Sequence, residues 1–234
     1  MSPTLVVSSP CVSFFTAKVE EMKPKNPVLM RQATHDDVLR LVAMNHAAYP
    51  DLVEENVVWN EEQLRTHLAV FPSGQLVAER DGVIVGALST FIVPASTDAL
   101  AQHTWYEITD NGTFKSHDDR GETLYLADVY VDPSAWGSGV GAALYTALRD
   151  MCRTLGRKRI VAGGRLWAYF EFAQRLRPEE YVAQVIAGQI PDRVLTSQLR
   201  AGFAVRGILK NYLQDGRSRS FATLLEWKNP DVSV

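Results

Sequence analysis

A strand, a turn, a cluster of glycines and a helix follow one another near the middle of the chain, and they limit its fold more than any other feature. An apolar run occupies positions 124–131, and apolar residues then recur with helical spacing over 140–155. Gly137, Gly139 and Gly141 stand where the helix is predicted to begin. Such glycines leave backbone N–H groups uncovered at a helix N-terminus, where the helix dipole favours an anion. The pattern predicts a binding site for a pyrophosphate.

The glycines have two other interpretations. Gly137, Gly139 and Ala142 also match the GxGxxG/A pattern of dinucleotide-binding folds. In those folds the strand leads directly into the first glycine, and an acidic residue follows about 20 positions later, at the end of the next strand. Here residues 132–136 intervene, and the next predicted strand, 159–163, has no acid. The context argues against a dinucleotide site and leaves close helix packing as the other role for the glycines.

The remaining periodicities predict a mixed fold. Residues 75–80 and 83–93 flank an Asp-Gly dipeptide and predict an antiparallel hairpin. The other predicted strands are 28–31, 159–162, 203–213 and 220–227, and further helices begin near Thr34, Asn60, Pro178 and Val194. We therefore predict one α+β domain over 28–234, preceded by an N-terminal extension, 1–27.

Charge and cysteine content exclude several classes of protein. The chain has 24 basic and 27 acidic residues, a formal net charge of -3, so neither a nucleic-acid groove nor a membrane-binding surface is expected. No segment approaches the roughly 18 to 20 apolar residues that cross a bilayer. Cys11 and Cys152 are the only cysteines, and no Cys/His spacing is typical of a metal site. We expect a cytoplasmic protein with no bound metal and no disulfide framework.

The turn and its glycines carry a specific resemblance. Val129-Tyr-Val-Asp-Pro, followed by Trp136-Gly-Ser-Gly-Val-Gly-Ala-Ala-Leu, resembles the acetyl-CoA motif of the GNAT family of N-acetyltransferases. The order of predicted elements over 28–228 is similar to that family too. Through Thr104-Trp105, Gly163-Gly164-Arg165 and other short motifs, the chain most resembles the acetyltransferase domain fused to nitrilase-like carbon-nitrogen hydrolases. No hydrolase sequence follows position 234, so we expect a free-standing version of that domain.

The resemblance implies a mixed, mostly antiparallel central sheet flanked by helices, with an inserted helical segment at 164–192. It implies that one strand splays from its neighbour, so that the backbone of Val129, Tyr130 and Val131 faces the pantetheine arm of acetyl-CoA or another acyl-CoA. The other cofactor-binding residues that it implies are Trp136, Gly137, Ser138, Gly139, Val140, Gly141 and Ala142. The implied acceptor is a small-molecule or peptide amine, and a homodimer is compatible with the family.

The chain departs from the family pattern at two positions. Trp136 stands where the family usually carries Gln or Arg, so a cation is lost beside the phosphates, although the ring can pack against the cofactor. Gln198 lies four residues before the Gly202-Phe203 pair, where many members place a tyrosine that acts as general acid. A glutamine side chain cannot protonate a leaving thiolate. The acid is therefore either elsewhere or absent.

Asp128 is the first catalytic candidate. Alternation along the strand places it on one face with Leu124, Leu126 and Tyr130. Partial burial there raises the pKa of a carboxyl group, which suits it to take a proton from an ammonium through water. The alternative is a structural carboxylate that accepts hydrogen bonds from nearby backbone donors.

Tyr169, in the inserted segment, is the second candidate, because a tyrosine can act as general acid. The alternative is that it packs with Trp167 and Phe170 in an aromatic cluster. Arg165 is suited to orient an acidic acceptor, or else is an ordinary solvated arginine.

These observations favour an enzyme that passes an acetyl group from acetyl-CoA to an amine. The altered residues at Trp136 and Gln198 favour the alternative of a non-catalytic module that binds CoA or regulates. A third interpretation is a structural partner domain that once served a hydrolase.

Overall fold

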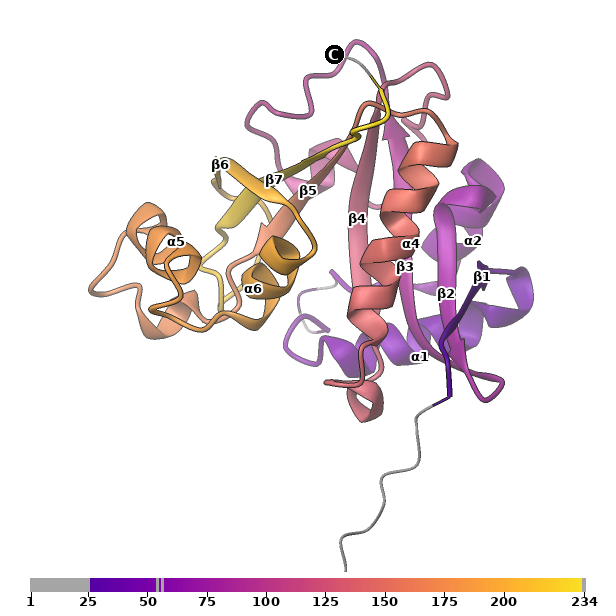
Figure 1. Ribbon diagram of the computed structural model, residues 1–234, viewed down its shortest axis with the longest axis horizontal. Helices are drawn as coiled ribbons and strands as arrows, with labels where there is room; N and C mark the ends of the chain where they lie inside the picture. Colours follow the sequence, from indigo (N-terminus) through magenta and orange to yellow (C-terminus); the bar gives the residue numbers. More distant parts are fainter. Residues whose placement is uncertain (1–25, 54, 56, 233–234) are drawn as a thin grey trace, which may run out of the picture.

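A seven-stranded sheet organises the computed structural model, which describes residues 26–53, 55 and 57–232 (Figure 1). The strands lie in the order β1-β2-β3-β4-β5-β7-β6, and only β4 and β5 are parallel neighbours. Their bounds are β1 Leu29–Gln32, β2 Gln75–Arg80, β3 Val83–Val93, β4 Thr123–Val131, β5 Arg159–Arg165, β6 Ala204–Leu209 and β7 Ala222–Lys228. The predicted N-terminal extension, 1–27, lies outside the described residues except for its last two positions.

Helices cover both faces of the sheet. The α-helices are α1 Val38–Ala48, α2 Glu61–Val70, α3 Trp105–Ile108, α4 Val140–Thr154, α5 Pro178–Ile186 and α6 Arg193–Arg200, and single 3-10 turns span His35–Asp37, Pro72–Gly74, Pro133–Ala135 and Tyr169–Glu171. Figure 1 shows α4 in front of the sheet and α1 behind it. Buried side chains of α4, α5 and α6 form one apolar core, and those of α1, α2 and α3 form a second.

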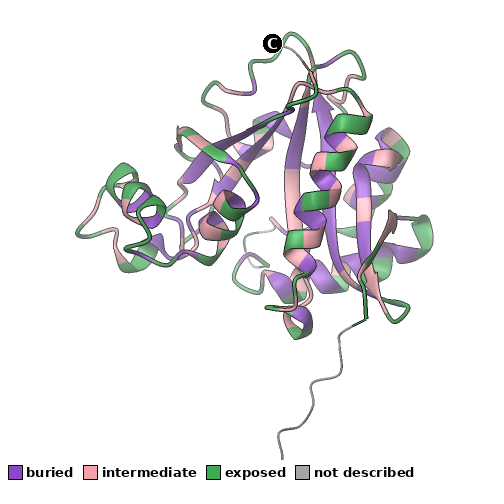
Figure 2. Cartoon of the chain, viewed as in Figure 1, coloured by how far each residue is buried: buried purple, intermediate pink, exposed green. Residues whose placement is uncertain are grey.

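The structure confirms the predicted α+β class and the mostly antiparallel sheet. Local signals positioned several elements correctly. The Asn60 side chain caps α2 by accepting a hydrogen bond from the Gln63 backbone N–H at 2.9 Å. Along α4, buried residues recur on the side that faces the sheet, while the opposite side is exposed (Figure 2). Side-chain periodicity therefore predicted both the existence and the orientation of α4.

The pairing between β4 and β5 ends early. It spans four residue pairs and stops at Leu126 and Ala162, although β4 continues to Val131 and β5 to Arg165. Beyond that point the two strands separate, as the resemblance implies. The last hairpin then completes the sheet on the far side of β5, where β7 lies between β5 and β6.

A β-bulge changes the alternation of side chains in β4. Ser89 of β3 pairs with Asp128, and the next residue of β3 pairs with Leu126, so Ala127 has no partner in β3. One extra residue moves the following side chains to the opposite face. Leu126 accordingly lies in the core beneath α4, whereas Tyr130 lies in the core beside α1. The prediction that Asp128 shares a face with Leu126 is wrong, because Asp128 points toward α1.

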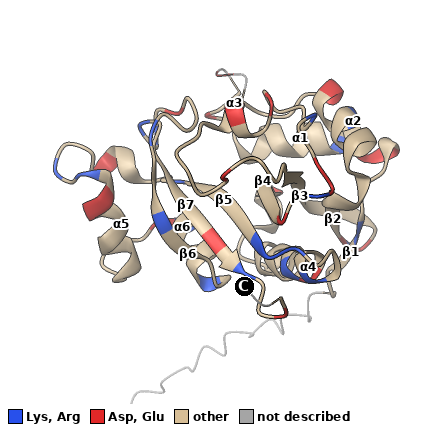
Figure 3. Ribbon diagram, turned by 90° about the horizontal axis from the view of Figure 1, so that it is seen from above, with Lys and Arg blue, Asp and Glu red and all other residues tan. Residues whose placement is uncertain are grey.

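Charged residues of both signs are interspersed over the outer elements (Figure 3). Acidic residues lie on α2 and α5, and basic residues lie on α4 and at strand ends. Within the described residues, no helix has the length and apolar character needed to cross a membrane.

The packing of α4 gives a stability prediction. Leu144, on α4, is fully buried, and Leu39, on α1, is 67% exposed. We expect Leu144→Ala to lower the free energy of unfolding by about 2 to 5 kcal/mol, because it leaves a cavity in a close-packed core. Leu39→Ala, the matched control, should change it by less than about 0.5 kcal/mol. Urea unfolding curves measure both, and equal losses would contradict this account of the core.

Candidate active site

A cavity of about 510 Å³ opens where β4 and β5 separate. One wall is β4 together with the start of α4, and the other is the end of β5 together with the first two turns of α6. Of the predicted cofactor-binding residues, those that line the cavity are Val129, Tyr130, Val131, Trp136, Gly137, Gly139, Val140 and Gly141. Ser138 and Ala142 do not. The separated strands thus bring most of the predicted site together.

The glycine turn presents free backbone donors to this cavity. Gly139, the N-cap of α4, has a φ of 88°, and Gly137 has a φ of 70°, both in the left-handed region that favours glycine. Within the described chain, no acceptor is present for the backbone N–H groups of Gly137, Gly139, Val140, Gly141 and Ala142. A Cβ atom added to Gly137 or to Gly139 would meet no other atom within 4 Å. The turn is therefore an open cradle of amides suited to an anion.

A cation lies beside this cradle despite the departure at Trp136. The Arg80 guanidinium, from β2, donates to the Ser138 Oγ at 3.0 Å and to the Ser138 carbonyl at 3.2 Å. The Trp136 ring is 48% exposed, and its indole N–H donates to the Val131 carbonyl at 2.9 Å. Trp136 itself supplies no cation, but Arg80 of β2 places one beside the turn.

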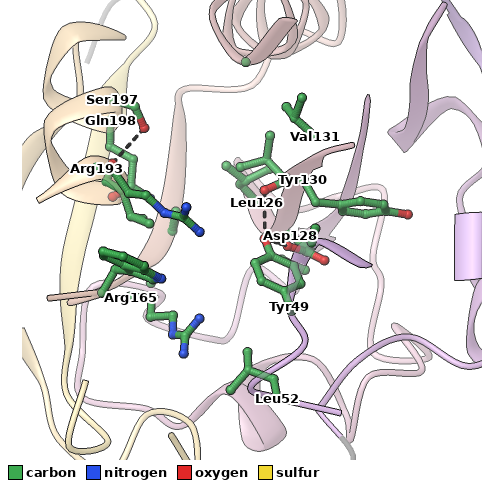
Figure 4. Close-up of a pocket in the computed structure, with 18 of the residues that line it drawn as sticks. Tyr49, Leu52, Leu126, Asp128, Tyr130, Val131, Arg165, Arg193, Ser197 and Gln198 are labelled. Carbon is green, nitrogen blue, oxygen red and sulfur yellow. Dashed lines mark hydrogen bonds between the residues drawn. The ribbon is translucent and has the colours of Figure 1, made fainter. Parts of the chain in front are cut away.

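Asp128 is held at the cavity wall by two side chains of the N-terminal region. Its carboxylate accepts hydrogen bonds from the Asn45 amide and from the Tyr49 hydroxyl, both at 2.8 Å. Burial raises the pKa of Asp128 to about 6, and these hydrogen bonds oppose the rise because they stabilise the charged form. Figure 4 shows Asp128 and Tyr49 together on one side of the cavity. The carboxylate is ionised at neutral pH and able to accept a proton.

Sequence patterns did not identify Asn45 and Tyr49 as parts of the site. Both belong to α1 or its C-terminal cap, about 80 positions before Asp128 in the chain. The Tyr49 hydroxyl also lies 2.9 Å from the Val129 carbonyl. The only sequence signal for these two residues is a polar residue within the helix that faces the bulged strand. That signal can be recognised only when the three-dimensional arrangement of the helix and the strand is known.

The structure corrects the expectation for Tyr169. Its side chain is buried, its hydroxyl donates to the Leu176 carbonyl at 2.9 Å, and it does not line the cavity. Its ring packs against Tyr181 and Phe221. The aromatic-packing interpretation of this cluster therefore describes Tyr169 better than the role of an acid.

A different tyrosine lies near Gln198. Tyr145, from α4, lines the cavity, as do Ser197 and Gln198 of α6. Burial raises the pKa of Tyr145 to about 12, and the side chains of Ser197 and Gln198 oppose that rise. Tyr145 is therefore protonated at neutral pH. It offers a proton close to Gln198, whose amide cannot act as a general acid. The helical periodicity of α4 did not distinguish Tyr145, because Tyr145 is one of several buried residues in that helix.

Arg165 is neither solvated nor free. It ends β5 inside the cavity, where its guanidinium donates to both carboxylate oxygens of Asp215, at 2.6 and 2.7 Å, and to Asp51. These carboxylates raise the pKa of Arg165, although burial acts against them. Within 26–53, 55 and 57–232, no group of three or more His, Cys, Asp or Glu side chains is placed to hold a metal ion.

Comparison with known proteins shows to which family the chain belongs. Residues 40–171 match the model of the Acetyltransferase (GNAT) family. Over 200 residues the chain is 34% identical to "Uncharacterized N-acetyltransferase YkwB" of Bacillus subtilis (strain 168), covering 86% of this chain and 88% of that protein. The chain belongs to the GNAT family, and it is an acetyltransferase by this membership.

A second relative agrees with the resemblance to hydrolase-fused domains. The chain is 34% identical over 215 residues to "Probable hydrolase YhcX" of the same organism, covering 92% of this chain but only 41% of that longer protein.

Solved structures show the same fold. The loading GNATL domain of CurA from Lyngbya majuscula superposes with a TM-score of 0.75 at 20% identity, covering 88% of this chain and all of that one. The GphF GNAT-like decarboxylase, solved in complex with isobutyryl-CoA, has a TM-score of 0.74 at 25% identity, covering 86% and 99% of the two chains.

The hydrogen bonds around Asp128 give a testable pKa. Tyr49→Phe removes a donor that stabilises the carboxylate, so the pKa of Asp128 should rise from about 6 by roughly half to one pH unit. Tyr125→Phe is the control, because the Tyr125 hydroxyl contacts Tyr212 rather than Asp128. Carboxyl ¹³C NMR titration measures the change. An unchanged or lower value in the first variant would contradict the assigned hydrogen bond.

Proposed function

We propose that the protein transfers an acetyl group from acetyl-CoA to an amine. The observation that carries the proposal is the juxtaposition of separated strands and an open amide cradle at one end of a single cavity. Separated strands leave room for an extended chain along β4, and the cradle suits a pyrophosphate at the end of that chain. The GNAT family membership supports the same assignment.

The residues present fit acetyl-CoA. Five amides from Gly137 to Ala142, without an acceptor in the described chain, offer hydrogen-bond donors to a pyrophosphate, and the Arg80 guanidinium adds a positive charge beside them. Val129 and Val131, beyond the end of the β4–β5 ladder, line the cavity where the pantetheine arm would run. When bound, acetyl-CoA supplies an activated thioester for attack by an amine.

The Asp128 carboxylate is the proposed base. An amine reaches the site as an ammonium, and it must lose a proton before it can attack. Asp128, ionised above about pH 6, accepts that proton directly or through water, while Asn45 and Tyr49 hold the carboxylate in place. Tyr145 of α4, protonated at neutral pH and close to Ser197 and Gln198, is the proposed donor to the leaving thiolate.

A non-catalytic CoA-binding module is the second candidate, since Gln198 stands where many family members place a tyrosine that acts as general acid. It predicts the same cofactor binding but no turnover with any amine. The presence of Asp128 with a raised pKa in the same cavity favours the enzyme.

The cofactor assignment predicts a change in thermal stability. Acetyl-CoA at about 100 times its dissociation constant should stabilise the folded state by about 2.7 kcal/mol. Gly139→Glu should abolish this, because a carboxylate then occupies the anion cradle. Gly156→Glu is a matched control at the other end of α4, since Gly156 also has a positive φ of 63° and open space around its Cβ position. Loss of the shift in both variants, or in neither, would contradict the assignment.

The catalytic assignment predicts a specific pH profile. The kcat/KM of the wild type should fall below about pH 6, because protonation of Asp128 removes the base. Asp128→Asn should lose about 100-fold or more in rate together with that acidic limb. Turnover is measured against a panel of amines by release of free thiol. An Asp128→Asn enzyme that keeps the limb would exclude Asp128 as the base.

The proposed acid is tested by a second pair of variants. Tyr145→Phe should lower kcat by about 100-fold or more. Tyr169→Phe, whose hydroxyl lies outside the cavity, should stay within about threefold of wild type. The reverse order of effects in steady-state kinetics would show that the acid is Tyr169 after all.

A further inference from the structure

A stack of alternating cations and aromatic rings lies at the cavity, and three of its members, Trp136, Trp167 and Arg193, line the cavity wall. The Arg193 guanidinium lies over the Trp136 ring at 4.5 Å and over the Trp167 ring at 4.2 Å. The Arg217 guanidinium also lies over Trp167, at 4.3 Å from that ring, and it lies 4.9 Å from the Phe170 ring. Cation–π contacts on both faces hold the Arg193 side chain in one place without using its N–H donors.

Arg193 differs from its neighbours in having no carboxylate partner within the described part of the chain. Arg165 pairs with Asp215 and Asp51, and Arg217 also lies 3.2 Å from Asp51. Arg165 and Arg217 therefore take both carboxylates, and Arg193 pairs with neither. Partial desolvation lowers the pKa of Arg193, and the two neighbouring arginines lower it further, because loss of water and like charges both disfavour another cation. The wall carries an excess positive charge that an anionic ligand would relieve.

The adjacent carboxylate of Asp192 does not balance this charge by direct pairing. Asp192 is fully buried, and it caps α6 by accepting hydrogen bonds from the backbone N–H groups of Val194 and Leu195. Its other oxygen accepts from the Tyr181 hydroxyl and the Ala168 backbone N–H. The donors of Arg193 stay available to a ligand in the cavity.

The two walls of the cavity have opposite character. Figure 4 shows the guanidinium groups of Arg193 and Arg165 reaching into the cavity from one side, with Tyr49 and Asp128 on the other side. A carboxylate base on one wall suits a cationic amine, and an unpaired guanidinium on the other suits an anion. A ligand that carries both groups would satisfy both walls.

We propose that Arg193 binds a carboxylate of the substrate. Resting on the proposed acetyl transfer, the first source of this carboxylate is the acceptor, which would then be an amino acid or another amine that also carries a carboxylate. The same chemistry is supplied by an acyl-CoA whose acyl group ends in a carboxylate, such as malonyl-CoA. Guanidinium and carboxylate match in shape and charge, so the stack works as a fixed clamp for this group.

The experiment compares matched ligands with and without the carboxylate. In the acceptor arm, L-amino acids and their amides are assayed with acetyl-CoA by thiol release. In the acyl arm, the binding of malonyl-CoA, acetyl-CoA and CoA is measured by calorimetry, which does not need turnover. Each arm uses the wild type, Arg193→Gln and Arg193→Lys. Arg175→Gln is the control, because Arg175 makes a similar contact with the Phe172 ring outside the cavity.

In one of the two arms we expect a preference for the carboxylated ligand that falls by roughly 10- to 100-fold in Arg193→Gln. Arg193→Lys should retain part of it, and Arg175→Gln all of it. A preference among amines assigns the carboxylate to the acceptor, and a preference for malonyl-CoA assigns it to the acyl group.

Two results would overturn the inference. One is the absence of any preference in both arms, with Arg193→Gln equal to wild type. The other is an equal loss of affinity for CoA, acetyl-CoA and malonyl-CoA in Arg193→Gln, which would show that Arg193 binds the cofactor phosphates instead. Neither result bears on the proposed acetyl transfer, which fails separately if acetyl-CoA neither binds nor reacts with any amine.

Discussion

The early end of the pairing between β4 and β5 is the constraint on which the site depends. Four residue pairs join the two strands, and then each continues alone for several residues. Strand edges inside a protein need hydrogen-bond partners. Side chains approach some of them, since the Tyr49 hydroxyl lies 2.9 Å from the Val129 carbonyl and the Trp136 indole N–H donates to the Val131 carbonyl. The gap between the strands becomes the cavity, and the glycine turn closes one end of it.

The bulge in β4 gives this cavity its chemistry. Because Ala127 has no partner in β3, Asp128 points toward α1, where Asn45 and Tyr49 bind its carboxylate. The opposite wall carries Arg193, which lies between two tryptophan rings and has no carboxylate partner among the described residues. The molecule thus places a carboxylate and a cation on facing walls, and the gap in the sheet keeps them apart.

Short-range signals predicted the elements better than their assembly. Helical periodicity and the glycines identified α4 and its amide cradle, because both depend on residues within one turn of each other. The bulge at Ala127, by contrast, is a mismatch between two strands, so alternation within β4 alone placed Asp128 on the wrong face. For the same reason the sequence did not identify Tyr49 and Arg193 as site residues, since each contacts residues tens of positions away in the chain. The order β5-β7-β6 likewise depends on pairing between distant segments.

Hydrogen–deuterium exchange with and without acetyl-CoA tests the central claim most directly, because it reports on each wall of the gap. The account predicts slower exchange in two separate segments, residues 127–131 of β4 and residues 137–142 of the turn, with no change in α2 on the outer surface. Protection that is absent from both segments, or that appears only outside the cavity, would show that the gap between β4 and β5 is not where the cofactor binds.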